Sequence, residues 1–181
     1  SLREEFQPLL ESKKKTNKET NGSNIVLSQI ENEEQLDQAI AFHVLNPEAP
    51  VSEYRAAETH QFALGLPEAY YGPNSYDKWI RVGWALANTH PKMFVTWLKM
   101  SCRDNCRATL AGLDGKFDWA HVPLLWDTWC KFDFTTAESE GLSYRSIMFW
   151  CKADAPNKFD EIKKTTIDYF IDESLDPGRQ V

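Results

Sequence analysis

The 181-residue chain contains no run of about 20 apolar residues, the length that a helix needs to cross a lipid bilayer. It also lacks an excess of positive charge, because 27 acidic and 20 basic residues give a formal net charge of -7. Duplex DNA is held mainly by clustered Lys and Arg side chains on its phosphates. The charge balance therefore argues against a free-standing, non-specific DNA coat, and any contact with nucleic acid must be a local patch.

Several catalytic motifs are missing as well. A P-loop needs Ser or Thr where Phe117 follows Lys116, and Gly where Leu110 stands five residues before Gly115. The sequence has no Asp-x-Asp pair for two-metal nucleotidyl transfer, and no strand-turn Ser motif or Cys in a catalytic context. We therefore expect this segment to have no catalytic activity of its own and to bind no cofactor.

The four cysteines lack the regular spacing of a small secreted scaffold, so reduced thiols and an intracellular location are expected. Cys102 and Cys106 are four residues apart, and a zinc tetrahedron would need His121, Cys130 or Cys151 to complete it. Structural zinc sites usually combine two closely spaced pairs, and only one pair exists here. We predict core thiols and no metal site, with a zinc module or metal-dependent enzyme as the alternative.

The chain divides into a polar end and a single folded domain. With 42% hydrophobic and 13% aromatic residues it is long enough for one well-formed core and short for two. We predict a flexible, polar and basic linker or arm over 1–28, a helical domain over 29–173 and a tail over 174–181. Because the chain starts at Ser and not Met, we expect it to be a piece of a longer protein.

Apolar residues recur with a period close to 3.6 in segment after segment, which predicts helices. The run NIVLSQI is the only strand-like stretch. Start signals predict helices at Asn32 with Gln35 reaching back, at Ser52, at Asn74 or Ser75, at Pro91, at Pro123, at Ser143 and at Pro156. The expected fold is all-α or nearly so, a compact bundle of about six to seven helices with a Trp-rich core.

The stretch SYDKWIRVGWALANTH carries two tryptophans on a helix that could serve either as a base-stacking surface or as core. Its apolar residues follow the i, i+3, i+4, i+7 spacing of one buried stripe, which favours the core. Gly83 inside a helix costs about 1 kcal/mol, so we expect a neighbouring helix to pack closely on it through Trp97 or Trp126. The predicted structural core comprises Tyr76, Trp79, Gly83, Trp84, Trp97, Trp126, Trp129 and Trp150.

Four fragments in a fixed order resemble the primase C-terminal helical domain (PriCT-like) of giant-virus and phage primase-helicase replication proteins. They are YYGPNSYDKWIRVGWALANT, FVTWLKMS, LLWDTW and SYRSIMFWCKADAP, which together extend over about residues 70–165. The residues that match the family pattern are Tyr76, Trp79, Val82, Gly83, Ala85, Leu86, Trp97, Ser101, Trp126 or Trp129, Ser146, Ile147, Trp150, Lys152, Asp154 and Pro156. The chain departs from the pattern in the long insert at 103–121 and in Cys151, where a small residue is usual.

The resemblance implies a non-catalytic connector in a DNA-replication protein. The parent would carry a primase or primase-polymerase domain upstream and an ATP-dependent helicase of the AAA+ type downstream. The segment would assist primer synthesis or couple primase to helicase. Its partners would be those neighbouring domains and, weakly, single-stranded template DNA. No membrane is expected as a partner. The location would be the site of DNA replication, whether virus factory, host cytoplasm or nucleus.

A modest basic surface is the candidate for DNA contact. The predicted nucleic-acid-binding residues are Lys78, Arg81, Arg145, Lys152, Lys158, Lys163 and Lys164, with Lys99, Arg103 and Arg107 also near the Trp pair. Charges on helix exteriors are usually just solvated faces, and acidic residues are in excess. The alternative is therefore a protein–protein docking module that does not bind nucleic acid, since an acidic, aromatic-rich chain can leave an apolar patch for a partner.

Overall fold

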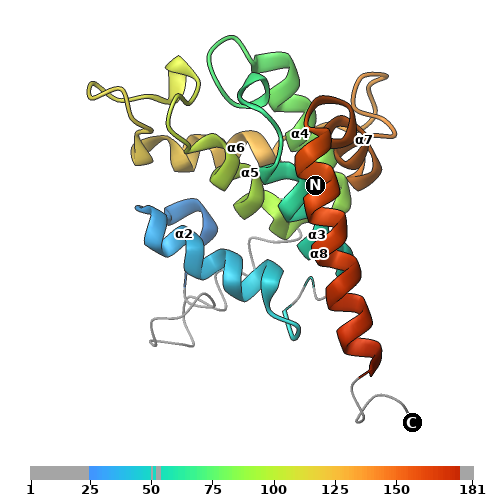
Figure 1. Cartoon of the computed structure of the whole chain (residues 1–181). Helices are drawn as coiled ribbons and strands as arrows, with labels where there is room; N and C mark the ends of the chain where they lie inside the picture. The colour runs from blue at the N-terminus through green and yellow to red at the C-terminus, as the bar shows by residue number, and fades with distance from the viewer. Residues whose placement is uncertain (1–24, 50, 52–53, 176–181) are drawn as a thin grey trace.

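Helices account for nearly all regular structure in the computed structural model, which describes residues 25–49, 51 and 54–175, and side chains only as far as residue 165 (Figure 1). The α-helices are α2 (Glu33–Ile40), α3 (Tyr54–Leu64), α4 (Tyr76–Thr89), α5 (Phe94–Ser101), α6 (Val122–Cys130), α7 (Tyr144–Asp154) and α8 (Pro156–Leu175). A single isolated bridge, between Ala111 and Phe117, is the only extended pairing among the described residues. The predicted all-α fold is confirmed.

Short helical turns join these helices. They are the 3-10 turns η2 (Leu27–Gln29), η4 (Glu68–Tyr70), η5 (Pro91–Met93), η6 (Ala108–Leu110) and η7 (Trp119–His121), and the π-turn η3 (Ala41–Leu45) that continues α2. The strand-like run NIVLSQI contains no strand among its described residues, because Leu27–Gln29 form the η2 turn. Leu27 and Ile30 are buried there in the common core, so the helical domain begins before residue 29, its predicted first residue.

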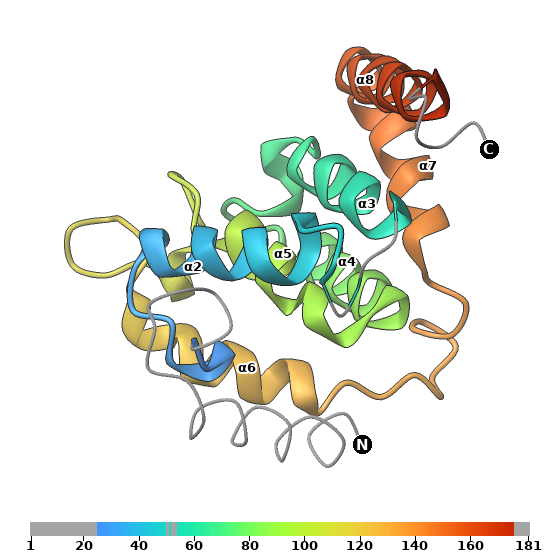
Figure 2. The same cartoon turned by 90° about the horizontal axis from the view of Figure 1, so that it is seen from below.

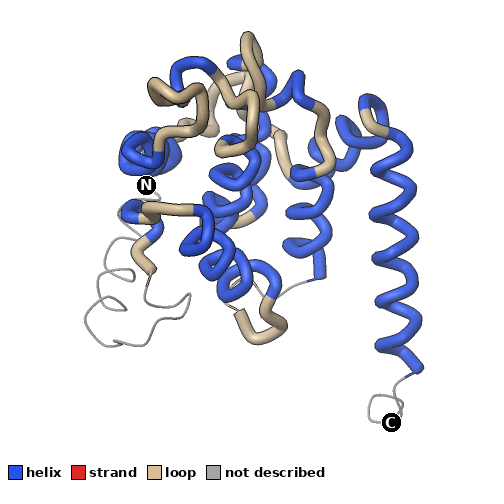
Figure 3. The backbone as a smooth tube through the Cα atoms, turned by 60° about the vertical axis from the view of Figure 1, so that its left-hand side comes forward, coloured by secondary structure: helices blue, strands red, loops and turns tan. Residues whose placement is uncertain are grey.

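Helix α5 lies at the centre of the bundle and packs against α2, α3, α4 and α6. Apart from Lys99, every residue of α5 is buried, which is the pattern of a helix surrounded by others. Figure 2 shows α2 and α6 on one side of the molecule and α7 and α8 at the opposite end. Helix α8 packs on α7 and α3 and forms the outer edge, which Figure 3 shows as the longest straight segment.

Most predicted helix starts agree with the structure, but Ser75 precedes α4 without a side-chain cap hydrogen bond and α6 begins at Val122, one residue before Pro123. The Asn32 side chain accepts a hydrogen bond from the Gln35 N–H at 2.8 Å, and Ser143 forms a capping box with Ser146. Pro91 begins the η5 turn that leads into α5, and Pro156 is the first residue of α8. The start predicted at Ser52 lies outside the described residues, and α3 is described from Tyr54.

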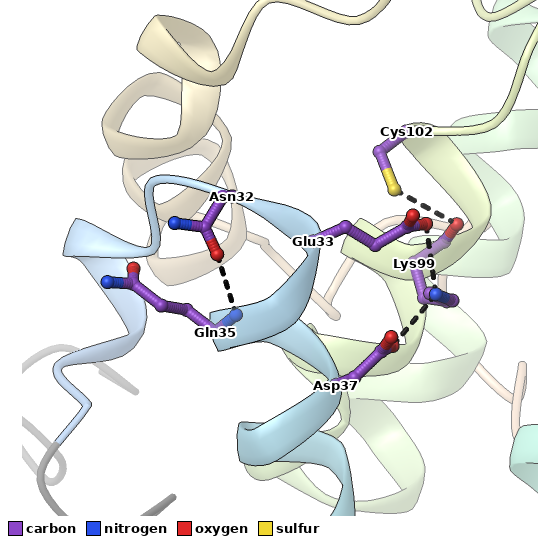
Figure 4. Close-up of polar contacts among 6 residues, drawn as sticks. All are labelled: Asn32, Glu33, Gln35, Asp37, Lys99 and Cys102. Carbon is purple, nitrogen blue, oxygen red and sulfur yellow. Dashed lines mark hydrogen bonds and ion pairs between the residues drawn. The ribbon is translucent and has the colours of Figure 1, made fainter. Parts of the chain in front are cut away.

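Two ion pairs that share Lys99 link helix α2 to the central helix α5 (Figure 4). The Lys99 ammonium lies 3.0 Å from Glu33 and 2.8 Å from Asp37. Burial opposes the charged form of Lys99, but hydrogen bonds to the two carboxylates outweigh it and raise its pKa. Lys99 therefore joins α5 to α2 and is not part of a free basic surface.

Trp79 and Trp97 stack at the centre of the core with ring centroids 4.5 Å apart. Both indoles are satisfied, since Trp79 Nε1 donates to Ser101 Oγ at 2.7 Å and Trp97 Nε1 donates to the Trp79 carbonyl at 3.2 Å. Trp126 and Trp129 are buried against the same group of rings. These tryptophans are core residues, and a base cannot stack on rings that solvent does not reach.

Gly83 allows α4 to approach α5 at very short range. A Cβ atom at this position would lie 2.9 Å from Trp97 Cε2 and 3.0 Å from Phe132 Cζ. Real Cβ atoms do not approach other carbons so closely, and both rings belong to the packed aromatic core. The close packing expected at Gly83, with Trp97 as its partner, is confirmed.

Three aromatic residues of the predicted core are less enclosed than expected. Tyr76 is 53% exposed, so its assignment to the core is wrong. It lies in the first turn of α4, where its ring is left open to solvent and the stripe spacing alone does not ensure burial. Trp84 and Trp150 are half-buried and pack on the edge of the core, where each keeps part of its ring in solvent.

A buried histidine should make the fold sensitive to mild acid. His60 is buried, shares a 2.8 Å hydrogen bond with Thr96 Oγ1, and has its pKa lowered from 6.5 to about 4 by burial and then by the charges of Lys99 and Arg103. Unfolded His60 binds a proton below pH 6.5 while folded His60 does not, so stability falls as pH falls towards 4.

We expect the wild-type free energy of unfolding to drop by about 2 kcal/mol more between pH 7 and pH 5 than that of His60→Gln, which does not titrate at this position. Urea unfolding at both pH values measures the difference. Carboxylates that titrate in the same range contribute equally to both proteins, so their contribution to the pH dependence cancels. Equal pH dependence in wild type and variant would show that folded His60 takes up its proton normally.

Candidate nucleic-acid interface

Four cationic side chains lie over aromatic rings around the start of α4. Lys78 Nζ is 4.9 Å from the Tyr70 ring centroid, and the Arg81 guanidinium carbon is 5.3 Å from the Trp150 ring centroid. The guanidinium carbon of Arg103 is 5.0 Å from the Tyr71 ring, and that of Arg107 is 5.1 Å from the Tyr76 ring. We call this set the cation–aromatic surface: Tyr70, Tyr71, Tyr76, Lys78, Arg81, Arg103, Arg107 and Trp150.

Three segments supply seven of these residues, and α7 supplies Trp150. The η4 turn and the residue after it carry the two adjacent tyrosines, α4 carries Lys78 and Arg81, and the loop after α5 carries the two other arginines. Gly72 allows the first and last of these to meet, because a Cβ there would lie 3.2 Å from the Asn105 carbonyl oxygen. Asn105 itself has a φ of 61°, which turns the loop back towards α4.

Helix α7 completes the surface from its C-terminal half. The Tyr70 hydroxyl donates a short hydrogen bond to Asp154, and the Tyr70 and Trp150 ring centroids are 6.2 Å apart. Burial and then the hydrogen bond to Asp154 raise the pKa of Tyr70, so its hydroxyl stays protonated. The tyrosine is thus fixed between α4 and α7, where it supports both Lys78 and the Trp150 ring.

The charges of the surface are mixed and differ in accessibility. Lys78 and Arg81 are exposed, whereas Arg103 and Arg107 are half-buried, and Arg103 donates a hydrogen bond to the Leu64 carbonyl. Burial lowers the pKa of Arg107. Acidic side chains stand close in sequence at Glu68, Asp77 and Asp104, all exposed. Such an arrangement can hold a few phosphates and offer the exposed Tyr76 ring to a base, but it cannot bind polyanions strongly.

Only two of the seven basic residues predicted from the sequence meet at this surface, namely Lys78 and Arg81. Arg145 lies over the neighbouring Tyr144 ring, and Lys152 lies over Phe159. Lys158 pairs with Glu161 at 3.5 Å, and Lys163 pairs with Glu58 at 3.7 Å. Lys164 is exposed on α8. The five C-terminal residues are therefore spread along α7 and α8, and two of them already face a carboxylate.

Sequence reasoning missed Tyr70 and Tyr71 and did not separate Arg103 and Arg107 from the other basic residues near the Trp pair. Their position depends on the loop after α5 folding back onto α4, which no helical periodicity reveals. One local signal was present, since Tyr70 and Tyr71 are adjacent aromatics just before Gly72 and Pro73, at the start of the fragment YYGPNSYDKWIRVGWALANT.

The cysteines lie in the protein interior or at its edge. Burial raises the pKa of Cys102 to about 12 and that of Cys151 to about 11, and it also raises the pKa of Cys106. Cys102, Cys106 and Cys151 are free thiols. Because the thiolate is the reactive form, these groups are poor nucleophiles at neutral pH. Among the described residues, no three His, Cys, Asp or Glu side chains are grouped so as to hold a metal ion.

Comparisons with known proteins add no identification, since no family model, curated protein or solved structure matches the chain. Within the part of the chain that the structure describes, none of the helices combines the length and the apolar character needed to cross a membrane.

Proposed function

We propose that this chain is a non-catalytic connector domain of a DNA-replication primase-helicase or primase-polymerase, and that it makes weak contact with single-stranded DNA. The observation that carries the DNA contact is the cation–aromatic surface, in which each of four cations lies over an aromatic ring. The place of the domain in replication rests on the resemblance of residues 70–165 to the primase C-terminal domain. Lys78, Arg81 and Trp150 of the cation–aromatic surface fall inside the resembling fragments.

Single strands suit this surface better than duplex DNA. An exposed Tyr76 ring and a guanidinium stacked on Trp150 present flat faces on which an unpaired base can lie. Bases of a duplex are already stacked, and duplex affinity comes from many phosphate contacts that a chain of net charge -7 does not supply. The expected affinity is accordingly low, and in the parent protein the flanking domains would hold the template near.

A supporting role fits the chemistry of the side chains. The P-loop, the Asp-x-Asp pair and the strand-turn nucleophile are all absent from the sequence, and burial raises the pKa of three of the four thiols. We propose that the domain positions the template strand or couples primase to helicase, and that neighbouring domains perform the chemistry. A Walker A motif downstream in the parent sequence is the simplest check, and a parent without primase or helicase motifs would contradict the connector role.

The DNA contact is tested by fluorescence anisotropy with a labelled oligo-dT. We expect binding that weakens about tenfold between about 50 mM and about 200 mM salt, as two to three phosphate contacts to a single strand predict. Size-exclusion chromatography with light scattering is run on the same sample. Self-association without any salt-sensitive DNA binding would contradict the proposal and favour the alternative, a protein–protein docking module.

A further inference from the structure

A groove of about 490 Å³ runs between α4, the end of α6 and the loop that follows α6. Its lining includes three aromatic side chains, which we call its floor, and three carboxylates, which we call its rim, together with Lys131. The floor is Tyr76, Trp84 and Phe132, and the rim is Asp127, Asp133 and Glu138. We call it the α4–α6 groove. The cation–aromatic surface adjoins it, because the Tyr76 ring carries Arg107 and also lines the groove.

The floor of the groove is open to solvent. Tyr76 is 53% exposed, and Trp84 and Phe132 are half-buried with ring centroids 6.5 Å apart in an edge-on arrangement. Aromatic faces attract cations, and nearby carboxylates strengthen that attraction. The apolar stem of a lysine can also lie on such rings while its ammonium reaches the rim. The groove thus combines aromatic faces for the stem of a lysine side chain with carboxylates for its ammonium group.

One carboxylate of the rim, Asp133, is held in place before anything binds. Asp133 accepts hydrogen bonds from the Thr135 backbone N–H at 2.9 Å and from its hydroxyl at 2.6 Å. The buried Ser139 hydroxyl donates to the Asp133 carbonyl at 2.7 Å and so closes the loop on itself. Lys131 neutralises Asp127 at 2.9 Å, which leaves two carboxylates of the rim to face a ligand. A loop ordered in this way loses little conformational freedom when a ligand binds.

We infer that the α4–α6 groove binds the lysine cluster of this chain's own residues 13–18. That stretch, KKKTNK, holds Lys13, Lys14, Lys15 and Lys18, and it follows the apolar pair Leu9 and Leu10. It is the densest cluster of positive charge in the sequence, and its charge complements the rim of the groove. The inference does not depend on DNA binding, because it concerns contacts within the chain.

The cluster is within reach of the groove. Ile25 lies with Trp119 and Pro123 around a pocket at the start of α6, and the η2 turn packs on α6. The groove lies at the other end of this nine-residue helix, about 13 Å further on. The seven residues from Lys18 to Ile25 extend up to about 23 Å, which exceeds that length. Phosphate-bearing ligands fit the groove poorly, because the rim carboxylates repel them.

Zero-length cross-linking by carbodiimide on the intact chain tests the inference, since this reagent joins only lysine and carboxylate groups that touch. We expect cross-links from residues 13–18 to Asp133 or Glu138 in the monomer. They should be about tenfold more abundant than cross-links to Glu33 and Glu34, two carboxylates that a tethered but unbound segment would also reach. Equal yields at both places would overturn the inference. Cross-links found only in dimers would also overturn it and would assign the groove to a second copy.

A matched pair of variants gives a second readout, the rate of reductive methylation of each lysine by mass spectrometry. Asp133→Asn with Glu138→Gln removes the charge of the rim, and we expect methylation of Lys13, Lys14 and Lys15 to become several-fold faster, about threefold or more. Asp114→Asn with Glu140→Gln removes the same charge at exposed sites outside the groove lining and should leave these rates unchanged. The inference fails if both pairs have the same effect.

Discussion

Gly83→Leu is expected to destabilise the domain by more than about 3 kcal/mol, enough to unfold many domains of this size. The Cβ alone would lie 2.9 Å from Trp97 and 3.0 Å from Phe132, and three further carbons would have to enter the same space. Trp97 is fully buried and stacks on Trp79, so its ring cannot turn aside without disturbing the core. The gain of about 1 kcal/mol in helix propensity does not offset this overpacking.

Urea unfolding measures this loss, and two further variants make the measurement specific. Gly83→Ala adds only the Cβ, and we expect a loss of about 1 kcal/mol after its gain in helix propensity. Lys164→Leu places the same large side chain at an exposed position of α8 and should change stability by no more than about 0.5 kcal/mol. A Gly83→Leu protein as stable as the wild type would refute the close packing of α4 on α5.

Reversing the two exposed cations of the cation–aromatic surface is expected to weaken binding of single-stranded DNA on the order of a hundredfold. Lys78→Glu with Arg81→Glu removes two phosphate contacts and sets two carboxylates in their place. The guanidinium on which a base could stack at Trp150 is lost as well. Both positions are exposed in the first half of α4, where acidic residues are tolerated near the helix N-terminus, so folding should be unaffected.

The matched control is Lys158→Glu with Lys164→Glu, which changes the net charge equally but on α8. Lys158 already faces Glu161, and both lysines lie outside the cation–aromatic surface. Anisotropy titrations at one salt concentration compare the two double variants. We expect the affinity of the control for single-stranded DNA to fall at most about threefold, through the long-range electrostatic field. An equal loss in both would mean that only net charge governs binding, with no local surface.

Local signals in the sequence were sufficient for much of the fold. Asn32, Ser143 and Pro156 mark helix starts through chemistry within a few residues of the backbone that they cap or begin, so the pattern and the structure agree. Gly83 was informative because a glycine inside an apolar helix needs a compensating contact. The NIVLSQI run misled because a short apolar stretch with no other strand beside it buries its side chains equally well as a tight turn.

The candidate surface was harder to predict because tertiary contacts create it. Gly72 and the positive φ of Asn105 bring Arg107 to Tyr76, two residues 31 positions apart, and the sequence contains no pattern that links them. Lys99 was grouped with the basic residues around the Trp pair, but Glu33 and Asp37 of α2 neutralise it. Charge in a sequence thus shows which residues are available, whereas packing decides which of them remain free to meet a ligand.

A titration of the ¹⁵N-labelled domain with oligo-dT, followed by amide and indole chemical shifts, tests the central claim most directly. Contact at the cation–aromatic surface predicts shifts confined to residues 70–81, to the 103–107 loop and to the Trp150 indole, with the buried Trp97 and Trp129 indoles unmoved. Shifts concentrated on Lys158, Lys163 and Lys164 of α8, or none at millimolar oligonucleotide, would contradict it.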